Sequence, residues 1–471
     1  MKSFDVIQSD LASGTATCET ITQEYLDTIE EKKHLNALLA VFPEKAIEQA
    51  KSVDKRLREG TAGALAGMVV SIKDLICVKD ERVTCGSKIL ENFVSLYDAT
   101  VVQRLRNADA VIIGKNNLDE FAMGSSTENS AYGRVKLPQD EERVPGGSSG
   151  GSAVAVRTGM STTSLGSDTG GSIRQPAAFC GVIGLKPTYG RVSRYGLVAY
   201  ASSFDSIGPL ALTTRDAASV LQVIAGHDPN DSTSAEVLVP NYISQLTKDV
   251  KGLRVGIPKE YFGDALDYEI RQAVEQKVDI LRANGATIEE ISLPRTDYTI
   301  AAYYILATAE ASSNLARFDG ARYGFRTEKA AGLSEMYIKS RSEGFGAEVK
   351  RRIMLGTYVL SAGYYDAYYR KGQKVRRLIK DDFDKAFARV DCLIAPTSPS
   401  TSFKAGDKMD DPLQMYLSDI YTTSANLAGI PGMSIPCGED HQGLPIGLQI
   451  LGPQFGESII LRVADFLETA H

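Results

Sequence analysis

Histidine is scarce in this chain of 471 residues, which contains only four: His34, His227, His441 and His471. They lie after a charged run, within Asp/Gly-containing segments, or at the last position of the chain. None stands among apolar strands at a predicted pocket, so the sequence argues against a Ser-His-Asp triad.

Paired cysteines and long apolar runs are also absent. The six cysteines are scattered without a Cys-x-x-Cys spacing, which argues against a zinc site or a disulfide framework and favours a reducing compartment. The N-terminus has no apolar signal core, and no stretch approaches the roughly 18 apolar residues of a membrane span. We therefore expect a cytoplasmic protein with no metal site and no membrane attachment.

An excess of basic residues is missing as well. The chain has 59 acidic and 52 basic side chains, and its net charge is −7. Because binding to a phosphate backbone depends on clustered Lys and Arg, nucleic-acid binding is not expected to be the main task of this chain itself, although a partner that holds nucleic acid is compatible with it. The hydrophobic fraction of 43% predicts a folded chain with a sizeable core.

Apolar runs alternate with amphipathic stretches along the chain. Residues 1–60 are predicted to be helical and to pack on the remainder, and 68–72 form a short apolar run typical of a buried strand. With no linker and no internal repeat, the pattern indicates one α/β domain over 1–471 with helices on both faces of a sheet. Further strands are predicted at 110–113, 253–257, 287–291, 390–395, 433–435 and 444–451; helices are predicted at 101–105, 214–224, 270–281, 298–389 and after Pro412.

Residues 124–208 are rich in Gly, Ser and Thr, and they carry two similar motifs. Gly-Gly-Ser-Ser-Gly-Gly-Ser begins at 146 and Gly-Ser-Asp-Thr-Gly-Gly-Ser at 166, so that Ser148 and Ser172 each follow paired glycines. Glycine lets backbone N–H groups approach a ligand, which suits a serine nucleophile with an oxyanion hole. Ordinary turns or a phosphate-binding loop are the alternatives, but the spacings of dinucleotide and phosphate loops are absent. The expected oxyanion donors are the N–H groups of Thr169, Gly170, Gly171 and Ser172.

A serine nucleophile needs a base, and Lys73 is the best candidate. It ends the apolar run at 68–72, where burial would lower its pKa and leave the amine free to accept a proton. The alternative is a surface lysine whose stem covers the strand end.

The segment from Gly146 to Pro176 resembles the amidase signature, and the similarity extends over essentially the whole chain. The resemblance implies that Lys73 is the base, that Ser148 follows a cis peptide bond and relays protons, and that Ser172 is the nucleophile. It also implies an α/β/α sandwich with a mixed, mostly parallel central sheet covered by helices, in which 124–208 form the catalytic core.

Within this family, the segments 119–126, 186–193 and 342–352 resemble the glutamine-hydrolysing subunits of tRNA-dependent amidotransferases. This resemblance implies that Arg352 binds the carboxylate and Asp419 the ammonium group of glutamine, with Tyr303, Met123 and Gly124 nearby. Guanidinium for carboxylate and carboxylate for ammonium are matched chemically. From the residues alone, Arg352 could instead belong to a solvated basic helix face, and Asp419 and Tyr303 to ordinary helix surface and core.

The same resemblance implies partners and cofactors. The ammonia released would travel to a B subunit, which holds the tRNA and uses ATP and Mg²⁺ to convert Glu-tRNA(Gln) to Gln-tRNA(Gln), with a small C subunit bracing a heterotrimer. No cofactor is expected in this chain. The alternatives are a stand-alone amidase for small or aryl amides, a catalytically silent scaffold subunit, and a nucleotide-binding module. A few C-terminal residues are expected to be missing after His471.

Overall fold

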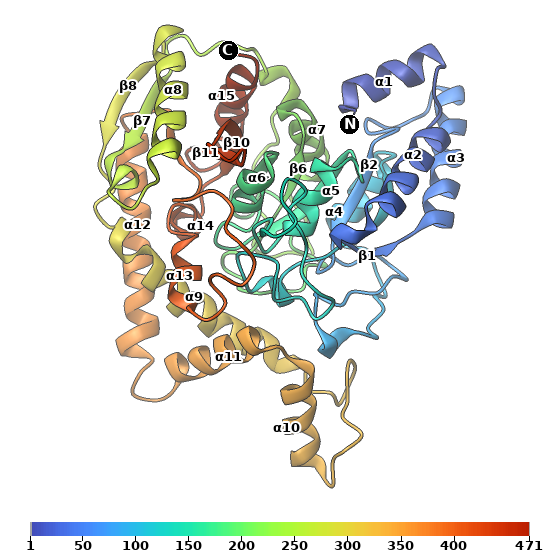
Figure 1. Cartoon of the computed structure of the whole chain (residues 1–471), viewed down its shortest axis with the longest axis vertical. Coiled ribbons are helices and arrows are strands. Elements are labelled where there is room, and N and C mark those ends of the chain that lie inside the picture. Colours follow the sequence, from blue (N-terminus) through green and yellow to red (C-terminus); the bar gives the residue numbers. More distant parts are fainter. Residues whose placement is uncertain (1, 471) are drawn as a thin grey trace.

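One continuous sheet forms the centre of the protein, whose computed structural model describes residues 2–470. In this part of the chain eleven strands follow the order β1-β3-β2-β4-β6-β5-β10-β11-β9-β7-β8 (Figure 1). The strands are β1 (Leu38–Val41), β2 (Val69–Lys73), β3 (Val111–Asn116), β4 (Thr163–Asp168), β5 (Ile183–Lys186), β6 (Ser206–Ala211), β7 (Arg254–Pro258), β8 (Thr287–Ile291), β9 (Cys392–Pro396), β10 (Gly432–Glu439) and β11 (Pro445–Leu451).

Helices lie on both faces of this sheet and beyond its lower end in Figure 1. They are α1 (Phe4–Ser13), α2 (Cys18–Glu31), α3 (Pro43–Glu59), α4 (Thr100–Asn107), α5 (Gly150–Arg157), α6 (Arg174–Cys180), α7 (Thr214–Ile224), α8 (Tyr268–Ala283), α9 (Thr299–Asn314), α10 (Leu333–Gly344), α11 (Ala347–Leu360), α12 (Lys371–Phe387), α13 (Pro412–Leu417), α14 (Thr423–Ala428) and α15 (Glu457–Thr469). The predicted α/β/α sandwich with a mixed sheet is confirmed.

The sheet is less parallel than the sequence predicts. Parallel pairs hold its two wings, β3-β2-β4 and β9-β7-β8. Antiparallel pairs join the strands between these wings, and β1 is antiparallel to β3 at one edge. The reason lies in the connections: β10 and β11 form a hairpin, and β6 runs back between β4 and β5, whereas helical crossovers make the parallel pairs.

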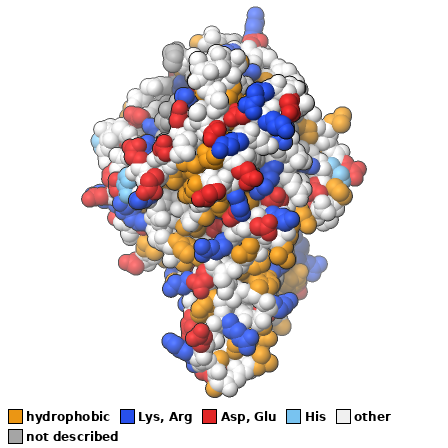
Figure 2. All heavy atoms as spheres, turned by 90° about the vertical axis from the view of Figure 1, so that its right-hand side faces the viewer, with side chains coloured by type: hydrophobic (Ala, Val, Ile, Leu, Met, Phe, Trp, Pro, Cys, Tyr) orange, Lys and Arg blue, Asp and Glu red, His pale blue; other side chains and the backbone are white. Residues whose placement is uncertain are grey.

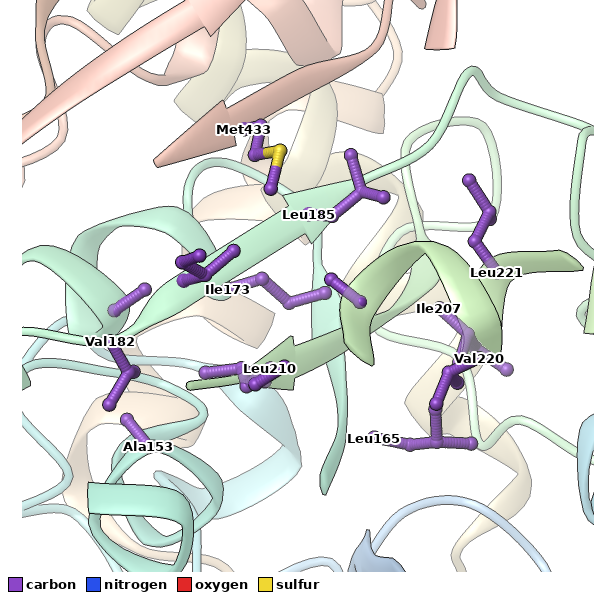
Figure 3. Close-up of a cluster of buried hydrophobic side chains, with 14 of the residues drawn as sticks. Ala153, Leu165, Ile173, Val182, Leu185, Ile207, Leu210, Val220, Leu221 and Met433 are labelled. Carbon is purple, nitrogen blue, oxygen red and sulfur yellow. The ribbon is translucent and has the colours of Figure 1, made fainter. Parts of the chain in front are cut away.

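The central strands are buried from both sides. Ile207 and Leu210 of β6 are three residues apart, so their side chains point to opposite faces. Figure 3 shows Ile207 beside Val220 of α7, within a cluster of buried aliphatic side chains from β4, β5, β6 and β10. On the sheet, α5 contacts α6, and α7 contacts α15. These helix pairs keep water away from the middle of the sheet, where the Gly/Ser-rich segments lie.

Two predicted helical regions contain other structure. Residues 1–60 include the edge strand β1 between α2 and α3, which pack against each other and contact β3. The long region 298–389 is helical except mainly between 318 and 332, where Gly320 and Gly324 adopt positive φ angles. Glycine takes this conformation readily and interrupts the helix.

The region α10–α11 projects from the lower end of the molecule in Figure 1. Figure 2 shows acidic and basic side chains interspersed over one face, with hydrophobic side chains on the narrow projection. The exposed apolar residues of α10 include Leu333 and Ile338. Within residues 2–470, no helix has the length and apolar character needed to cross a bilayer.

Helices α9 and α11 approach each other closely at Gly356. A Cβ atom at this position would lie 1.9 Å from the backbone oxygen of Thr308 on α9. The two helices carry Tyr303 and Arg352, so this contact sets the distance between two of the predicted substrate-binding residues.

Replacing Gly356 with Ala is expected to lower the free energy of unfolding by about 1–3 kcal/mol, because the helices must move apart. In a helix without such a contact, replacing Gly with Ala raises the free energy of unfolding by as much as about 1 kcal/mol. Chemical denaturation measures the difference. Gly263→Ala is the control, since a Cβ there meets nothing within 4 Å. Equal stability of Gly356→Ala and the parent protein would contradict the close packing.

Candidate active site

Three serine hydroxyls surround the amine of Lys73. Lys73 is the last residue of β2 and is fully buried. Its Nζ lies 2.7 Å from Ser148 Oγ, 2.8 Å from Ser149 Oγ and 2.9 Å from Ser167 Oγ. All three hydroxyl oxygens can accept from Nζ. No carboxylate bonds to this amine in the described part of the chain, so it has no direct counterion.

Burial lowers the pKa of Lys73 from its ordinary value of 10.5 to about 7, because the ammonium form loses its hydration. The nearby carboxylates of Asp119 and Asp168 raise the pKa and so limit this effect. Near neutral pH, a large fraction of the amine is thus unprotonated. An unprotonated amine in contact with a hydroxyl is suited to act as a general base.

The parallel pairing of β2 with β4 brings the two predicted motifs together. Ile72 is paired with Leu165, so Lys73 and the segment after Asp168 lie at the same edge of the sheet. Ser148 and Ser149 immediately precede α5, and the Gly147–Ser148 peptide bond is cis. The sheet edge and the start of α5 thus place the base and both serine-bearing segments side by side.

Ser172 lies in the turn between β4 and α6. Its side chain is the most accessible of the three predicted catalytic residues, at 9% exposure against 0% for Lys73 and Ser148. The backbone N–H of Ser149 donates to the carbonyl oxygen of Ser172 at 3.2 Å. This bond ties the segment of Ser148 to that of Ser172, and the Ser172 hydroxyl makes no hydrogen bond within residues 2–470. It is therefore available to a substrate.

The backbone of 169–172 presents three unengaged donors. The N–H groups of Thr169, Gly170 and Ser172 have no hydrogen-bond partner in the described part of the chain, whereas the Gly171 N–H donates to Asp168 Oδ1 at 2.9 Å. Gly171 has a φ of +133°, and a Cβ there would lie 2.1 Å from Thr422 Oγ1. Only glycine fits this close approach. Of the predicted oxyanion donors, only the Gly171 N–H is thus engaged within residues 2–470, while the separate side-chain hydroxyl of Thr169 donates to Asp205.

A fully buried ion pair holds this turn. Arg174 donates to both carboxylate oxygens of Asp168 at 3.1 Å, and Asn426 Nδ2 donates to Oδ1 at 2.9 Å. Burial alone would raise the pKa of Asp168, but the Arg174 guanidinium outweighs it and lowers the pKa to about 2. The ionised carboxylate also accepts from the Gly171 and Ile173 N–H groups. It therefore fixes the backbone on both sides of Ser172.

Asp119 orders the segment that contains Met123 and Gly124. Its carboxylate accepts from the backbone N–H groups of Thr127 at 2.9 Å and Asn129 at 3.2 Å. A Cβ on Gly124 would lie 2.4 Å from this carboxylate. Met123, which precedes Gly124 in the chain, is completely buried.

Arg352 is held in the interior by an acid and aromatic rings. Its Nε donates to Glu348 Oε1 at 2.8 Å and its Nη1 to the Tyr200 hydroxyl at 2.7 Å. The guanidinium also lies over the rings of Tyr200, Tyr304 and Tyr416, 5.2–5.6 Å from their centroids. Such an environment fixes the direction of a guanidinium more firmly than solvent would. Arg352 is thus not part of a solvated helix face.

Asp419 is a buried carboxylate with an unused oxygen. Oδ2 accepts from the Ser125 hydroxyl, while Oδ1 has no partner in residues 2–470. Burial raises the pKa of Asp419 to about 7. A buried acceptor without a partner is costly unless a ligand completes it. Asp419 therefore has the features expected of a ligand-binding group.

Tyr303 packs directly on residues 169–172, the predicted oxyanion segment. A Cβ on Gly170 would lie 2.6 Å from the Tyr303 hydroxyl, so ring and backbone are in close contact. A cavity of about 110 Å³ contains Gly124, Arg352 and Lys408 in its wall. The structure thus connects Tyr303 with the nucleophile segment, and Gly124 with Arg352.

Several residues that contact the site have no role predicted from the sequence. Ser149 and Ser167 touch the Lys73 amine, yet each is one of several serines in its motif and nothing in the spacing distinguishes it. Asp168 and Arg174 lie six residues apart within the second motif, and a buried acid–base pair in a Gly-rich turn was a signal available there. Tyr200 has no comparable local signal.

The sequence is similar to known proteins over almost the whole chain. The family model described as Amidase matches residues 20–461. The chain is 58% identical to the A subunit of glutamyl-tRNA(Gln) amidotransferase from Koribacter versatilis, over 99% of this chain and 98% of that protein.

Solved structures are similar over almost the whole chain. The A subunit of glutamyl-tRNA(Gln) amidotransferase from Thermotoga maritima has a TM-score of 0.80 and 42% identity, covering 96% of this chain and 91% of that one. The native peptide amidase from Stenotrophomonas maltophilia has a TM-score of 0.83 and 30% identity, with 99% and 96% covered.

Asp168→Asn is expected to lower the free energy of unfolding by about 3–5 kcal/mol, because Arg174 would remain charged and buried without its counterion. Denaturant titration measures this change. Asp391→Asn is the matched control: Asp391 pairs with Arg254 at the surface, and loss of an exposed pair costs about 0–1 kcal/mol. Similar losses for the two variants would show that the buried pair does not hold the turn.

Proposed function

Because this chain belongs to the amidase family, we propose that it is the glutamine-hydrolysing A subunit of a glutamyl-tRNA(Gln) amidotransferase, with Lys73, Ser148 and Ser172 as its catalytic residues. The full-length similarity to the A subunits of two such enzymes supports the assignment of the enzyme. The observation that carries the catalytic assignment is the contact of the buried Lys73 amine with Ser148 Oγ at 2.7 Å.

Lys73 serves as the base through Ser148. The Ser148 hydroxyl passes its proton to Lys73 Nζ and takes the proton of Ser172, whose oxygen attacks the side-chain amide carbon of glutamine. As the C–N bond breaks, Ser148 gives one proton to the amide nitrogen and regains one from Lys73, so that ammonia leaves and a γ-glutamyl ester remains on Ser172. Water then attacks this ester with the help of Lys73 and releases glutamate. A positioned base of this kind contributes about 10²–10⁴-fold to the rate.

The Gly170 and Ser172 N–H groups stabilise the negative oxygen of the tetrahedral intermediates. Both donors are free of other partners in residues 2–470, and the Asp168 carboxylate holds the intervening backbone in place. Donors that are oriented before the reaction need no rearrangement when the charge develops. Loss of one such donor costs roughly 10²–10³-fold in rate.

The two charged groups of glutamine match two buried residues of the site, a guanidinium and a carboxylate. Arg352 binds the α-carboxylate, and the unpartnered Oδ1 of Asp419 accepts from the α-ammonium group. Tyr303, Met123 and Gly124 border the bound substrate. Because Tyr303 lies on Gly170, a residue that borders the bound glutamine directly contacts the oxyanion segment.

Partner subunits complete the reaction in this proposal. The ammonia passes to a B subunit, which holds the tRNA and uses ATP and Mg²⁺ to amidate glutamate on tRNA(Gln), and a small C subunit braces the heterotrimer. The cytoplasm is the proposed location because charged tRNA is found there. A stand-alone amidase for small or aryl amides is less well supported, since the peptide amidase is 30% identical and the two amidotransferase subunits are 42% and 58% identical.

Ser172→Ala is expected to reduce the rate of glutamine hydrolysis by at least about 10³-fold, because the variant lacks the oxygen that attacks the amide carbon. The release of glutamate by the chain together with its partner subunits measures this rate. Lys73→Met should cause a comparable loss while the protein remains folded, since it removes only the amine. The exposed Ser232→Ala serves as control. Retention of normal activity in the Ser172 variant would exclude Ser172 as nucleophile.

The hydrolysis rate is expected to rise with pH through about pH 7. Lys73 must be neutral, so below pH 7 kcat should increase about tenfold per pH unit and then level off. Asp419 must be ionised to bind the α-ammonium group, and its pKa is also about 7. In the free enzyme both groups must lose a proton, so kcat/KM should rise by up to about 100-fold per unit.

Steady-state kinetics between pH 5.5 and 8 test this dependence. The Asp419→Asn variant should reduce the slope of log kcat/KM from two to one, because only Lys73 then titrates. A kcat that does not change with pH over this range would contradict the role of Lys73 as base.

A further inference from the structure

The residue that holds Arg352 is connected to the oxyanion segment by a short chain of hydrogen bonds. Arg352 Nη1 donates to the hydroxyl of Tyr200 at 2.7 Å, and the backbone N–H of Tyr200 donates to Asp205 Oδ2 at 3.0 Å. Asp205 Oδ1 in turn accepts from the hydroxyl of Thr169 at 2.7 Å. Thr169 directly precedes Gly170, whose N–H group is one of the free donors.

Every member of this chain is shielded from water. The exposed fractions are 3% for Arg352, 2% for Tyr200, 3% for Asp205 and 1% for Thr169. Asp205 Oδ1 also accepts from the backbone N–H of Ala201 at 3.2 Å, so the turn from 200 to 205 closes on one carboxylate. Hydrogen bonds in such surroundings hold their partners more firmly than exposed ones do.

The same turn is packed from its outer side. The ring of Phe204 lies against Tyr303, with centroids 5.9 Å apart, and the Arg376 guanidinium lies over Phe204 at 4.2 Å. A displacement of Arg352 and Tyr200 would therefore be transmitted to Asp205 and Thr169 instead of being absorbed by a loose loop. Neither Tyr200 nor Asp205 touches the reacting atoms.

We propose that Tyr200 and Asp205 are positioning residues that connect the carboxylate-binding Arg352 to the oxyanion segment at Thr169. Binding of an α-carboxylate to Arg352 thereby aligns the N–H group of Gly170, so that amides carrying this carboxylate are hydrolysed faster than amides that lack it. The inference rests on the proposed function, because it assumes that Arg352 receives the α-carboxylate of glutamine.

The proposal gives a specificity that contact with the substrate alone does not give. If Arg352 only bound the carboxylate, its effect would appear in KM, since an interaction equal in ground and transition states does not raise kcat. A connection to the oxyanion donors places part of the effect in kcat. The ratio of kcat for glutamine to kcat for a carboxylate-free analogue is therefore the measurement that isolates the connection.

The matched analogue is 4-aminobutanamide, which is glutamine without its α-carboxylate. The hydrolysis of both amides is measured for the chain together with its partner subunits. Tyr200→Phe removes the hydroxyl that accepts from Arg352, and Thr169→Val removes the hydroxyl that donates to Asp205. Each variant should lower the ratio of kcat for glutamine to kcat for 4-aminobutanamide about tenfold, the effect of one hydrogen bond to a charged group.

Three control variants separate positioning from general damage. Thr169→Ser keeps the donor and should restore the kcat ratio. Tyr195→Phe removes the hydroxyl of a partly exposed tyrosine nearby and should leave both substrates unaffected. The double variant Tyr200→Phe/Thr169→Val should be no worse than either single variant, because both changes break the same connection. Thermal unfolding midpoints show that each variant is folded.

The outcomes also distinguish the proposal from the function on which it rests. Equal loss of kcat for both substrates, or additive losses in the double variant, would overturn the connection. Arg352→Gln tests the underlying function, since it should raise KM for glutamine and not for 4-aminobutanamide. If Arg352→Gln has no such effect, the assumed binding of glutamine is wrong. If it has the effect while Tyr200→Phe leaves the kcat ratio unchanged, only the connection is wrong.

Discussion

The burial of the Lys73 amine is the constraint on which the site depends. An ammonium ion at this position would have to give up its hydration, and the three serine hydroxyls around Nζ do not replace it with negative charge. With its pKa lowered to about 7, the amine is largely unprotonated near neutral pH and is still basic enough to accept a proton. Nearby carboxylates raise the pKa of Lys73 and so offset part of the effect of burial. Their own hydrogen bonds fix their positions relative to the amine. The site thus combines one weakly charged base with acids that are fixed in place.

Those acids divide into two kinds. Arg174 keeps Asp168 ionised, and the carboxylate oxygens of Asp168 accept hydrogen bonds from the turn around Ser172. Asp419, in contrast, keeps one oxygen unpartnered in residues 2–470, and burial holds its pKa near 7. The first arrangement suits a permanent structural role and the second suits an incoming cation. The difference in hydrogen bonding, rather than the type of residue, distinguishes the carboxylate that holds the turn from the carboxylate with an oxygen open to a ligand.

Much of the fold was predictable wherever strands are apolar and helices amphipathic, as at β2, β7, β9 and α8. The strands β1, β4, β5 and β6 were missed. The clearest case is β4 (Thr-Ser-Leu-Gly-Ser-Asp), which is polar although fully buried. Its hydroxyls are satisfied across the sheet: Ser164 contacts Ser71 at 3.0 Å and also bonds to Asn116. Hydropathy cannot reveal a strand whose polar groups are paired with residues some 50 to 90 positions away. The mixed order of the central strands was hidden for the same reason.

The sequence by itself determined the chemistry of the site: a scarcity of histidine, two Gly-Gly-Ser motifs, and a lysine at the end of an apolar strand. These are local features, set by residue type and spacing over a few positions. Only the tertiary structure decided which hydroxyls touch the amine, that Arg352 lies among tyrosines and Glu348, and that Tyr200 and Asp205 join it to Thr169. These contacts join segments up to about 150 residues apart. They exist because the chain is folded around one sheet, and no short pattern encodes them.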